Sequence, residues 1–418
     1  MSDYFSEIFK YWKLIRFIMT SNYHREEFKI FENYNFLDWA VVSPAPTKAI
    51  NAVKKFLDSV IYFPEENASA QHVKMDSESI PLKKEVSKLL NSSEDEIAIT
   101  GTSTTQGVQI AFESINPKKG DNVVTCDMEF PLAGAELQKW KEKGVSIKVL
   151  KNKNGNFSTD ELISLIDKKT KIVFLDSVTW VNGFRFDIEE ISKITHEAGA
   201  YLVLDSIQHL GAMTLDTKKI DIDFIAAGGH KWLTTPLGIG ILYINKRHID
   251  SLHPPFYGYL NAKEPADGWD NFFRDVSKNP IIDYDYVHTA KKFEYGGTGP
   301  YPGIIGLTNS LSLINSIGIE NIEKKILKLK KVLIDELTAI GARVILPEDE
   351  KNYSSITTFN LNKTIKEDYA MVDRLNKAGV KVSGRGSSGV GGIRVSIHYP
   401  NEEDDIVKFV ESVKKMRW

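Results

Sequence analysis

Short apolar runs alternate with amphipathic segments from about residue 80 to residue 245, and this alternation most constrains the fold of the chain. The runs are rich in Val and Ile and are EIAIT (96–100), DNVVTCD (121–127), KIVFLDS (171–177), YLVLDS (201–206), FIAAGG (224–229) and GIGILYI (238–244). Continuously apolar strands are typical of a sheet covered on both faces, and intervening helices connect parallel strands. The sequence therefore predicts an α/β fold with a large, mostly parallel, doubly wound sheet.

The sequence changes character after this core. Residues 250–300 are rich in aromatic residues and proline without clear periodicity, which indicates a lid or a subunit contact. The remaining pattern predicts a long helix (307–340), a strand (354–361), a helix (366–379), a strand (392–399) and a terminal helix. We therefore predict an N-terminal helical segment (1–35), a large cofactor-binding domain (36–302) and a small C-terminal α+β domain (303–418).

The first residues are aromatic and apolar, but basic residues interrupt them, so they contain no uncharged core suited to a signal peptide or a membrane span. We expect an amphipathic helix that serves packing or dimer formation rather than membrane binding. Its apolar face would carry Phe5, Phe9, Trp12 and Phe17.

Composition excludes several classes of function. The formal net charge of −3 offers no basic surplus for binding nucleic acid. The single cysteine, Cys126, excludes an intrachain disulfide framework and indicates a cytoplasmic protein, in which we expect Cys126 to be a small buried residue. The nine histidines show no metal-ligand spacing, so we predict no metal site.

Two charged residues follow neighbouring apolar runs, where ligands collect at the carboxyl ends of parallel strands. Asp205 ends YLVLDS, and Lys231 follows FIAAGGH. They form either a structural ion pair or the two ends of a cofactor site. Pyridoxal phosphate requires such a pair, because its aldehyde condenses with a lysine amine and its ring nitrogen stays protonated beside a buried carboxylate.

Hydroxyl side chains crowd a turn from strand to helix at residues 102–105. Ser103 or Thr104 could simply cap the helix, which would explain one hydroxyl but not four in succession. The N-terminus of a helix also binds phosphate through its free N–H groups. The sequence therefore predicts a phosphate site at this turn, among residues 102–105.

Several segments, in order, resemble the class V aminotransferase family, of fold type I among pyridoxal phosphate enzymes, from about residue 36 to the C-terminus. GGHKWLTTPLGIGILY (228–243) resembles the lysine motif of the family, LDSIQHLGA (204–212) its Asp-x-x-Gln segment, and GIRVSIHYPNEEDD (392–405) its C-terminal signature. Cysteine desulfurases, isopenicillin N epimerase-like proteins and kynureninase belong to this family.

The resemblance implies a role for each matching residue. Lys231 would bind the cofactor and move the proton, Asp205 would face the ring nitrogen, and Gln208 would bind the phenolic oxygen. Thr104, Thr105 and His230 would hold the phosphate, and Phe130 would stack on the ring. Thr298 would reach the phosphate in a neighbouring subunit, so the resemblance implies a homodimer with its site at the interface. Arg394 would grip the α-carboxylate, with Arg185 and Arg385 as further candidates for substrate binding.

The reaction is less constrained than the cofactor. The segment VSGRGSSGVGG (382–392) lacks the cysteine that a desulfurase needs for sulfur transfer, which argues against that activity. We rank an aminotransferase acting on an amino acid first, because it demands no further residue. The alternatives are a β-elimination (C–S) lyase, an isopenicillin N epimerase-like epimerase and a non-catalytic regulatory protein that binds the cofactor. A dehydrogenase is disfavoured because the glycine fingerprint of dinucleotide binding is missing.

Overall fold

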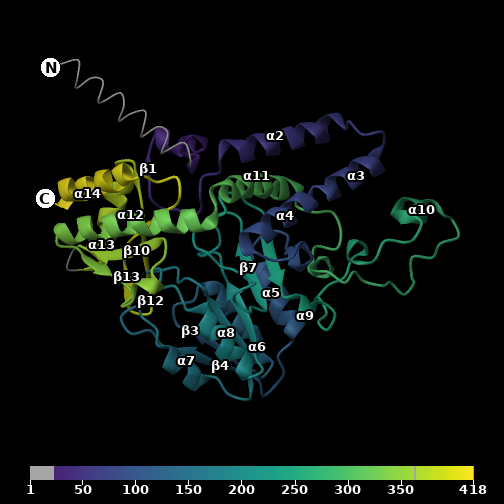
Figure 1. The fold of residues 1–418 in the computed structure, drawn as a ribbon, viewed down its shortest axis with the longest axis horizontal. Helices are drawn as coiled ribbons and strands as arrows, with labels where there is room; N and C mark the ends of the chain where they lie inside the picture. The colour runs from purple at the N-terminus through teal and green to yellow at the C-terminus, as the bar shows by residue number, and fades with distance from the viewer. Residues whose placement is uncertain (1–22, 362–363, 418) are drawn as a thin grey trace.

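The structure, a computed structural model, describes residues 23–361 and 364–417, and its centre is a seven-stranded sheet (Figure 1). The strand order is β2-β8-β7-β6-β5-β3-β4, and every neighbouring pair is parallel except the two pairs that β8 makes. The strands are β2 (Ile97–Ile99), β3 (Asn122–Cys126), β4 (Ser146–Leu150), β5 (Thr170–Asp176), β6 (Tyr201–Asp205), β7 (Phe224–Gly228) and β8 (Gly240–Ile244).

Helices cover this sheet on both faces, so its strands are buried on both sides. Alternate residues of β5 belong to two separate hydrophobic clusters: Ile172 and Phe174 to one, Val173 and Leu175 to the other. The helices of this part include α4 (Ser79–Leu90), α5 (Thr104–Ile115), α6 (Pro131–Glu142), α7 (Thr159–Leu165), α8 (Ile188–Glu197) and α9 (Lys246–Ile249). The predicted α/β fold with a mostly parallel sheet is confirmed.

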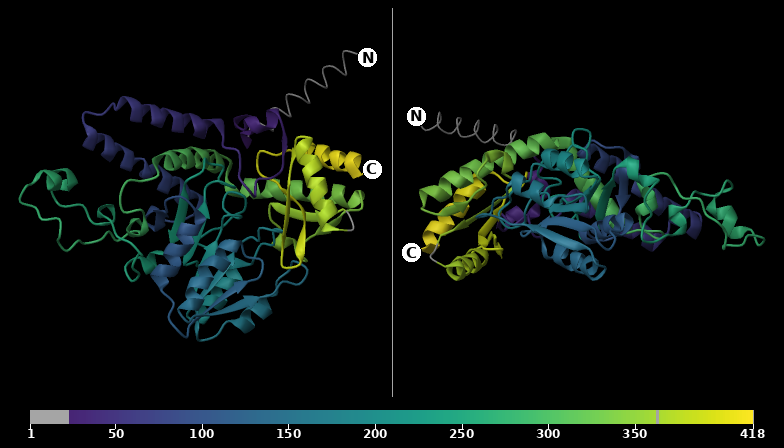
Figure 2. Two further views of the ribbon diagram at one scale, coloured as in Figure 1. Left: turned by 180° about the vertical axis from the view of Figure 1, so that it is seen from behind. Right: turned by 90° about the horizontal axis from the view of Figure 1, so that it is seen from below.

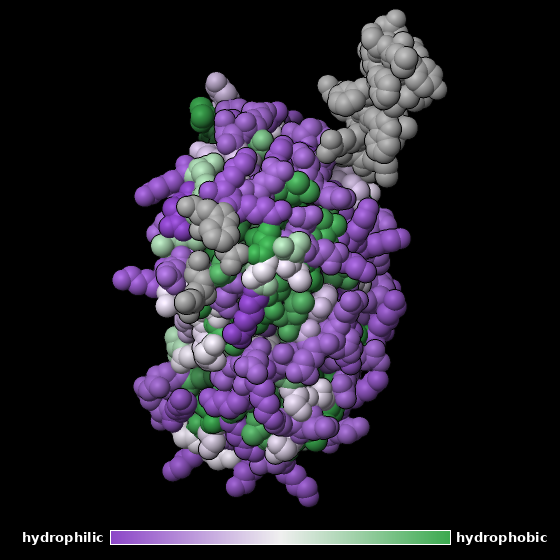
Figure 3. All heavy atoms as spheres, turned by 90° about the vertical axis from the view of Figure 1, so that its left-hand side faces the viewer, coloured by the Kyte–Doolittle hydropathy of each residue, from purple (hydrophilic) through white to green (hydrophobic). Residues whose placement is uncertain are grey.

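A second, antiparallel sheet forms the smaller C-terminal part, with the order β12-β13-β10-β9. Its elements are β9 (Arg343–Ile345), β10 (Ile356–Asn360), β12 (Ser383–Ser387), β13 (Val390–Ser396), α12 (Ile319–Ala339), α13 (Ile365–Lys377) and α14 (Glu403–Arg417). The end of the molecule that carries these helices is covered mainly by hydrophilic side chains, with apolar residues between them (Figure 3). Amphipathic helices of this kind bury one face and expose the other.

The single long helix predicted over residues 307–340 is wrong, because the structure has two helices there. These are α11 (Tyr301–Ile317) and α12 (Ile319–Ala339), and Gly318 separates them with a φ of 86°. This left-handed backbone costs glycine little and ends a helix. The break lies where the chain leaves α2 (Thr47–Tyr62) and α4, against which α11 packs, and enters the smaller part.

The N-terminal segment packs against the C-terminal part. The predicted amphipathic face with Phe5, Phe9, Trp12 and Phe17 lies outside the described residues. After it, Arg25 makes two hydrogen bonds to the carboxylate of Asp405, at 2.8 and 2.9 Å. Strand β1 (Asn35–Phe36) then pairs with β11 (Val380–Lys381). The domain limits given above stay predictions.

The aromatic segment at residues 250–300 has little regular structure. Within it, α10 (Gly268–Arg274) lies at the end of the molecule opposite the smaller sheet, and α2 and α3 (Ala68–Ser77) extend toward that end (Figure 2). The apolar side chains of Val276 and Ile281 are exposed in this segment. The lid or subunit contact expected for it stays a prediction. Among the described residues, no helix has both the length and the apolar character needed to span a membrane.

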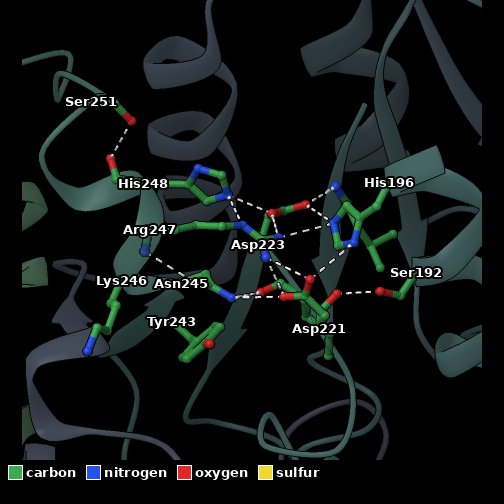
Figure 4. A network of polar contacts seen from close by, with 12 residues as sticks. Ser192, His196, Asp221, Asp223, Tyr243, Asn245, Lys246, Arg247, His248 and Ser251 are labelled. Carbon is green, nitrogen blue, oxygen red and sulfur yellow. Dashed lines mark hydrogen bonds and ion pairs between the residues drawn. The ribbon is translucent and has the colours of Figure 1, made fainter. Parts of the chain in front are cut away.

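A network of charged side chains surrounds Asp223, just before β7, at the amino end of the sheet (Figure 4). The Asp223 carboxylate contacts His196 at 2.8 Å, His248 at 2.6 Å and the Arg247 guanidinium. Burial alone would raise the pKa of Asp223, but these hydrogen bonds outweigh it and lower that pKa. This buried acid therefore has its counter-ions within the chain.

Candidate active site

A cavity of about 280 Å³ lies at the opposite, carboxyl end of the central sheet and is bordered by the smaller sheet. Its walls come from the start of α5, from segments that follow β3, β5, β6 and β7, and from β12 and β13. The lining residues are Ala40, Val41, Ser103, Thr104, Thr105, Phe130, Leu132, Trp180, Asp205, Ile207, Gln208, His230, Lys231, Arg385 and Arg394. This is where a parallel α/β sheet places ligands.

Lys231 lies three residues beyond the end of β7 and is 8% exposed. Its Nζ is 5.5 Å from the centroid of the Phe130 ring. Burial lowers the pKa of Lys231 to about 8, although the negative charge of Asp205 opposes that shift. A substantial fraction of the amine is therefore neutral at a slightly alkaline pH, as a nucleophile or base requires.

Asp205 ends β6 and is buried in the same cavity. One carboxylate oxygen accepts a hydrogen bond from the Ile207 N–H at 3.0 Å, but no cation of the described residues forms an ion pair with it. Burial raises the pKa of Asp205 to about 8, and the neighbouring carboxyl of Asp176 adds to the shift. Unlike Asp223, this acid has no cation in direct contact among the described residues, which suits a carboxylate that faces a cationic ligand.

Two further acids lie beside Asp205. Asp176 ends β5 directly opposite Asp205 in the parallel register, and its N–H donates to Glu129 at 2.8 Å. The nearby Glu129 carboxyl adds to the raised pKa of Asp176. Burial raises both pKa values, that of Glu129 to about 7. The pair therefore carries less than two negative charges beside Asp205.

The N-terminus of α5 forms another wall of the cavity. Ser103 caps this helix by accepting a hydrogen bond from the Gln106 N–H, so the capping interpretation holds for Ser103. Thr104 is buried, yet its Oγ1 has no hydrogen-bond partner among the described residues. A Cβ at Gly228 would lie 3.1 Å from both Thr104 Oγ1 and His230 Nδ1. Glycine therefore keeps open a polar recess that suits an anion.

Arg394, on β13, is almost completely buried at the side of the cavity formed by the smaller sheet. Its Nη1 donates to the Trp180 carbonyl at 2.7 Å, and its Nη2 lies 3.5 Å from Asp38. The Nε has no partner in the described part of the chain. Burial lowers the pKa of Arg394 to about 10, so it stays cationic at neutral pH and has a donor free for a carboxylate.

The structure brings together nine of the eleven predicted site residues in this cavity, and their individual roles stay predictions. The Gln208 side chain is fixed by a hydrogen bond, because Trp232 Nε1 donates to its Oε1 at 2.8 Å. Arg185 does not line the cavity: it pairs with Glu323 at 2.5 Å. This ion pair explains why its guanidinium is not directed at a substrate. Thr298 is exposed and also lies outside the lining, so its predicted contact with another subunit stays a prediction.

Sequence reasoning missed Trp180 and Asp38. Trp180 follows β5 by four residues, and its ring meets Phe130 edge-on at 5.6 Å. Its place after a strand end was a usable signal. Asp38 gave no signal, because it reaches Arg394 across 356 residues of sequence.

These residues fit pyridoxal phosphate. The orphaned Thr104 hydroxyl and the start of α5 suit its phosphate, the buried Asp205 suits its ring nitrogen, and Lys231 suits its aldehyde. The fold and the site thus define the class of pyridoxal phosphate-dependent enzymes of fold type I.

Comparisons with known proteins specify the family. The family model described as aminotransferase class-V matches residues 35–409. A protein of Methanothermobacter thermautotrophicus named "Probable cysteine desulfurase" is 26% identical over 412 residues, which cover 94% of this chain and 97% of the relative. An uncharacterized aminotransferase of Schizosaccharomyces pombe is 28% identical over 388 residues, or 92% of each chain. The chain therefore belongs to the class V aminotransferase family, and it is a pyridoxal phosphate-dependent enzyme.

Solved structures agree on the fold. A variant of C-DES with glycine covalently linked to its PLP cofactor has a TM-score of 0.81 at 20% identity, over 93% of this chain and 98% of that one. The apo cysteine desulfurase of Thermococcus onnurineus NA1 has a TM-score of 0.79 at 22% identity, over 94% and 96% of the two chains. These likenesses concern the fold alone.

The different surroundings of Asp205 and Asp223 predict opposite effects on stability. The pKa of Asp205 is raised in the folded protein, so the apoprotein loses stability as pH rises from about 4 to about 8. Asp205→Asn removes this loss, and near pH 8 we expect the variant to unfold at higher urea concentration than the wild type. The slope that one such group adds is at most about 1.4 kcal/mol per pH unit.

Asp223→Asn is the matched control for this measurement. The pKa of Asp223 is lowered on folding, so its contribution to stability is present above its unfolded pKa. This variant should therefore be less stable than the wild type both at about pH 5 and at about pH 8. Equal urea midpoints for wild type and Asp205→Asn throughout this range would contradict the assigned environment of Asp205.

Proposed function

We propose that the protein is an aminotransferase that moves an amino group from an amino acid to a 2-oxo acid. The observation that carries this proposal is that Lys231 supplies the one amine among the described residues that line the cavity, while Phe130, Trp180 and Leu132 contribute apolar walls. Transamination needs one group that takes a proton from Cα and delivers it elsewhere, and Lys231 suffices for both steps. Epimerisation needs a second acid or base, which these apolar side chains do not supply.

Each remaining group has a distinct task. When bound, pyridoxal phosphate supplies an electron sink for the negative charge that develops at Cα. Arg394 holds the α-carboxylate, and its bonds to Trp180 and Asp38 fix the plane of the guanidinium. A fixed carboxylate decides which bond of Cα faces Lys231. Asp205 would be ionised when the protonated ring nitrogen of the cofactor lies beside it, and it would stabilise that charge.

The pKa of Lys231 matches its task as a base. An amine with a pKa of about 8 is protonated in part at neutral pH, so it both accepts and returns a proton without a large energetic cost. Gln208 and Trp232 form a hydrogen-bonded wall beside it. Phe130 contributes an apolar ring to the wall of the site and exchanges no proton.

A β-elimination (C–S) lyase is the second candidate, because the same groups would expel a leaving group from Cβ. Cysteine desulfurase activity is disfavoured, although several relatives bear that name. Residues 382–392 contain no thiol, and Cys126 is buried with its Sγ donating to Glu129 at 3.1 Å. Burial raises the pKa of Cys126 well above its ordinary value, so it is not a reactive thiolate.

We further infer a homodimer that acts in the cytoplasm on a small amino acid, without nucleic acid or membrane as partner. Exposed Thr298, the aromatic segment at 250–300 and the exposed apolar residues of α2 and α10 support a subunit contact. The single cysteine supports a reducing compartment. The domain division at residues 36–302 and 303–418 belongs to the same proposal.

The decisive experiment mixes the holoenzyme with each common amino acid and several 2-oxo acids, and analyses the products. We expect a new amino acid and a new 2-oxo acid in equal amounts. Pyruvate released with ammonia or sulfide, without an amino acceptor, would instead establish the lyase. Loss of optical activity without new products would establish the epimerase, and alanine formed from cysteine together with persulfide or sulfide would establish a desulfurase.

A further inference from the structure

Two arginines face the cavity because of the register of the β12–β13 hairpin. Arg394 on β13 lies directly opposite Ser383 on β12, and Arg385 follows Ser383 by two residues. Residues two apart on a strand share a face, and so do directly opposed residues. Gly392 opposes Arg385 and has no side chain to separate the two guanidinium groups. Both guanidinium groups therefore point into the same cavity.

The two arginines differ in their partners. Arg394 already contacts Trp180 and Asp38, and Ser383 Oγ donates to the same Asp38 oxygen at 2.8 Å. Arg385 is half-buried, and its Nη1 donates to the carbonyl of the adjacent Gly384 at 2.9 Å. Within the described residues, no carboxylate lies within ion-pair distance of Arg385.

The charges in this part of the cavity are therefore unbalanced. Asp38 contacts Arg394 at 3.5 Å and feels the charge of Arg385, and it neutralises at most one of the two arginines. Burial raises the pKa of Asp38, and the positive charges of Arg394 and Arg385 counteract that shift. Like charges on one face of a sheet repel each other unless an anion lies between or beside them. The α-carboxylate of a substrate accounts for Arg394, and Arg385 remains without an anion.

The rest of the substrate end offers little to a neutral polar side chain. Its walls include Val41, Leu132 and Trp180. We propose that the substrate is a short amino acid whose side chain ends in a carboxylate or a similar anion, held by Arg385. The guanidinium fork matches such a group in a bidentate manner. The side chain is short because the same cavity of about 280 Å³ must also hold the cofactor. This inference rests on the proposed reaction at the amino group.

The test compares acidic amino acids with their uncharged isosteres. We expect the holoenzyme to react with aspartate or glutamate at least about tenfold more efficiently, in kcat/KM, than with asparagine or glutamine. Arg385→Gln should lower kcat/KM for the acidic substrate by about tenfold or more and leave the amide isostere unchanged. Arg343→Gln, on β9 of the same sheet but outside the cavity, is the matched control.

A binding measurement separates recognition from turnover. Calorimetry on the holoenzyme should detect tighter binding of succinate than of succinamate, and Arg385→Gln should abolish the difference. A preference for neutral amino acids, or an equal loss for both members of an isosteric pair in Arg385→Gln, would overturn the inference and leave the proposed reaction intact. No reaction with any amino acid would overturn both.

Discussion

Replacement of Lys231 by methionine is expected to abolish turnover, with a loss in kcat of about 10⁴-fold or more. Among the residues that the structure describes, Lys231 is the one lysine that lines the cavity, and burial lowers the pKa of its amine to about 8. Methionine fills a similar volume, so the cavity keeps its shape while the amine is lost. Borohydride reduction should attach the cofactor to the Lys231 peptide of the wild type, as mass spectrometry can establish, and to no peptide of the variant.

Lys330→Met is the matched control for this substitution. Lys330 is also fully buried, and burial lowers the pKa of its amine to about 7. Its Nζ donates to the Ile356 carbonyl at 2.6 Å and to Thr357 at 3.0 Å, away from the cavity. This variant should keep the yellow cofactor and its activity. Turnover and colour that persist in Lys231→Met would refute the assignment of the cofactor-binding amine.

The part of the site that lies on one sheet was predictable from sequence. Asp205 and Lys231 follow successive strands of a parallel sheet, and the carboxyl ends of such strands meet at one edge. The same rule pointed to Thr104 and Thr105, and both residues line the cavity. These positions depend on local patterns, because an apolar run determines where a strand ends and therefore which side chain comes next.

Local sequence patterns do not predict contacts between segments that are distant in the sequence. Asp38 meets Arg394 only because β1 and the residues after it pack against the smaller sheet. Arg185 looked suited to a substrate, but Glu323 on α12 neutralises it, and nothing in the sequence near residue 185 reveals that partner. Gly318 is a possible helix break in the sequence, but a glycine alone does not end a helix. The helix ends there because α11 and α12 pack against different parts of the molecule.

The buried acids show why the protonation state of a side chain cannot be predicted from the sequence. Asp205, Asp176 and Glu129 come from three segments, and their pKa values rise because burial removes water from all three. Asp223, an equally buried acid of the same sheet, has a lowered pKa because two histidines and an arginine surround it. The residue type is the same, and its neighbours decide its charge.

The second large effect concerns Arg394, and we expect Arg394→Lys to lower kcat/KM by about 100-fold for every amino acid substrate. Lysine keeps the positive charge but loses the fork that donates two parallel bonds to a carboxylate. The bond to Trp180 and the contact with Asp38 hold the guanidinium in place, and a flexible ammonium cannot reproduce both. The visible spectrum of the bound cofactor should stay unchanged, because Arg394 is assigned to the substrate rather than to the cofactor.

A pair of variants separates this role from a structural one. Arg394→Gln leaves the Asp38 carboxylate without its cation, which raises the pKa of Asp38 further and destabilises the fold. Adding Asp38→Asn removes that unpaired charge, so the double variant should regain thermal stability while its kcat/KM stays about 100-fold or more below that of the wild type. Steady-state kinetics and thermal unfolding of the two variants test this expectation. If activity returned together with stability, Arg394 would serve the fold and another group would bind the α-carboxylate.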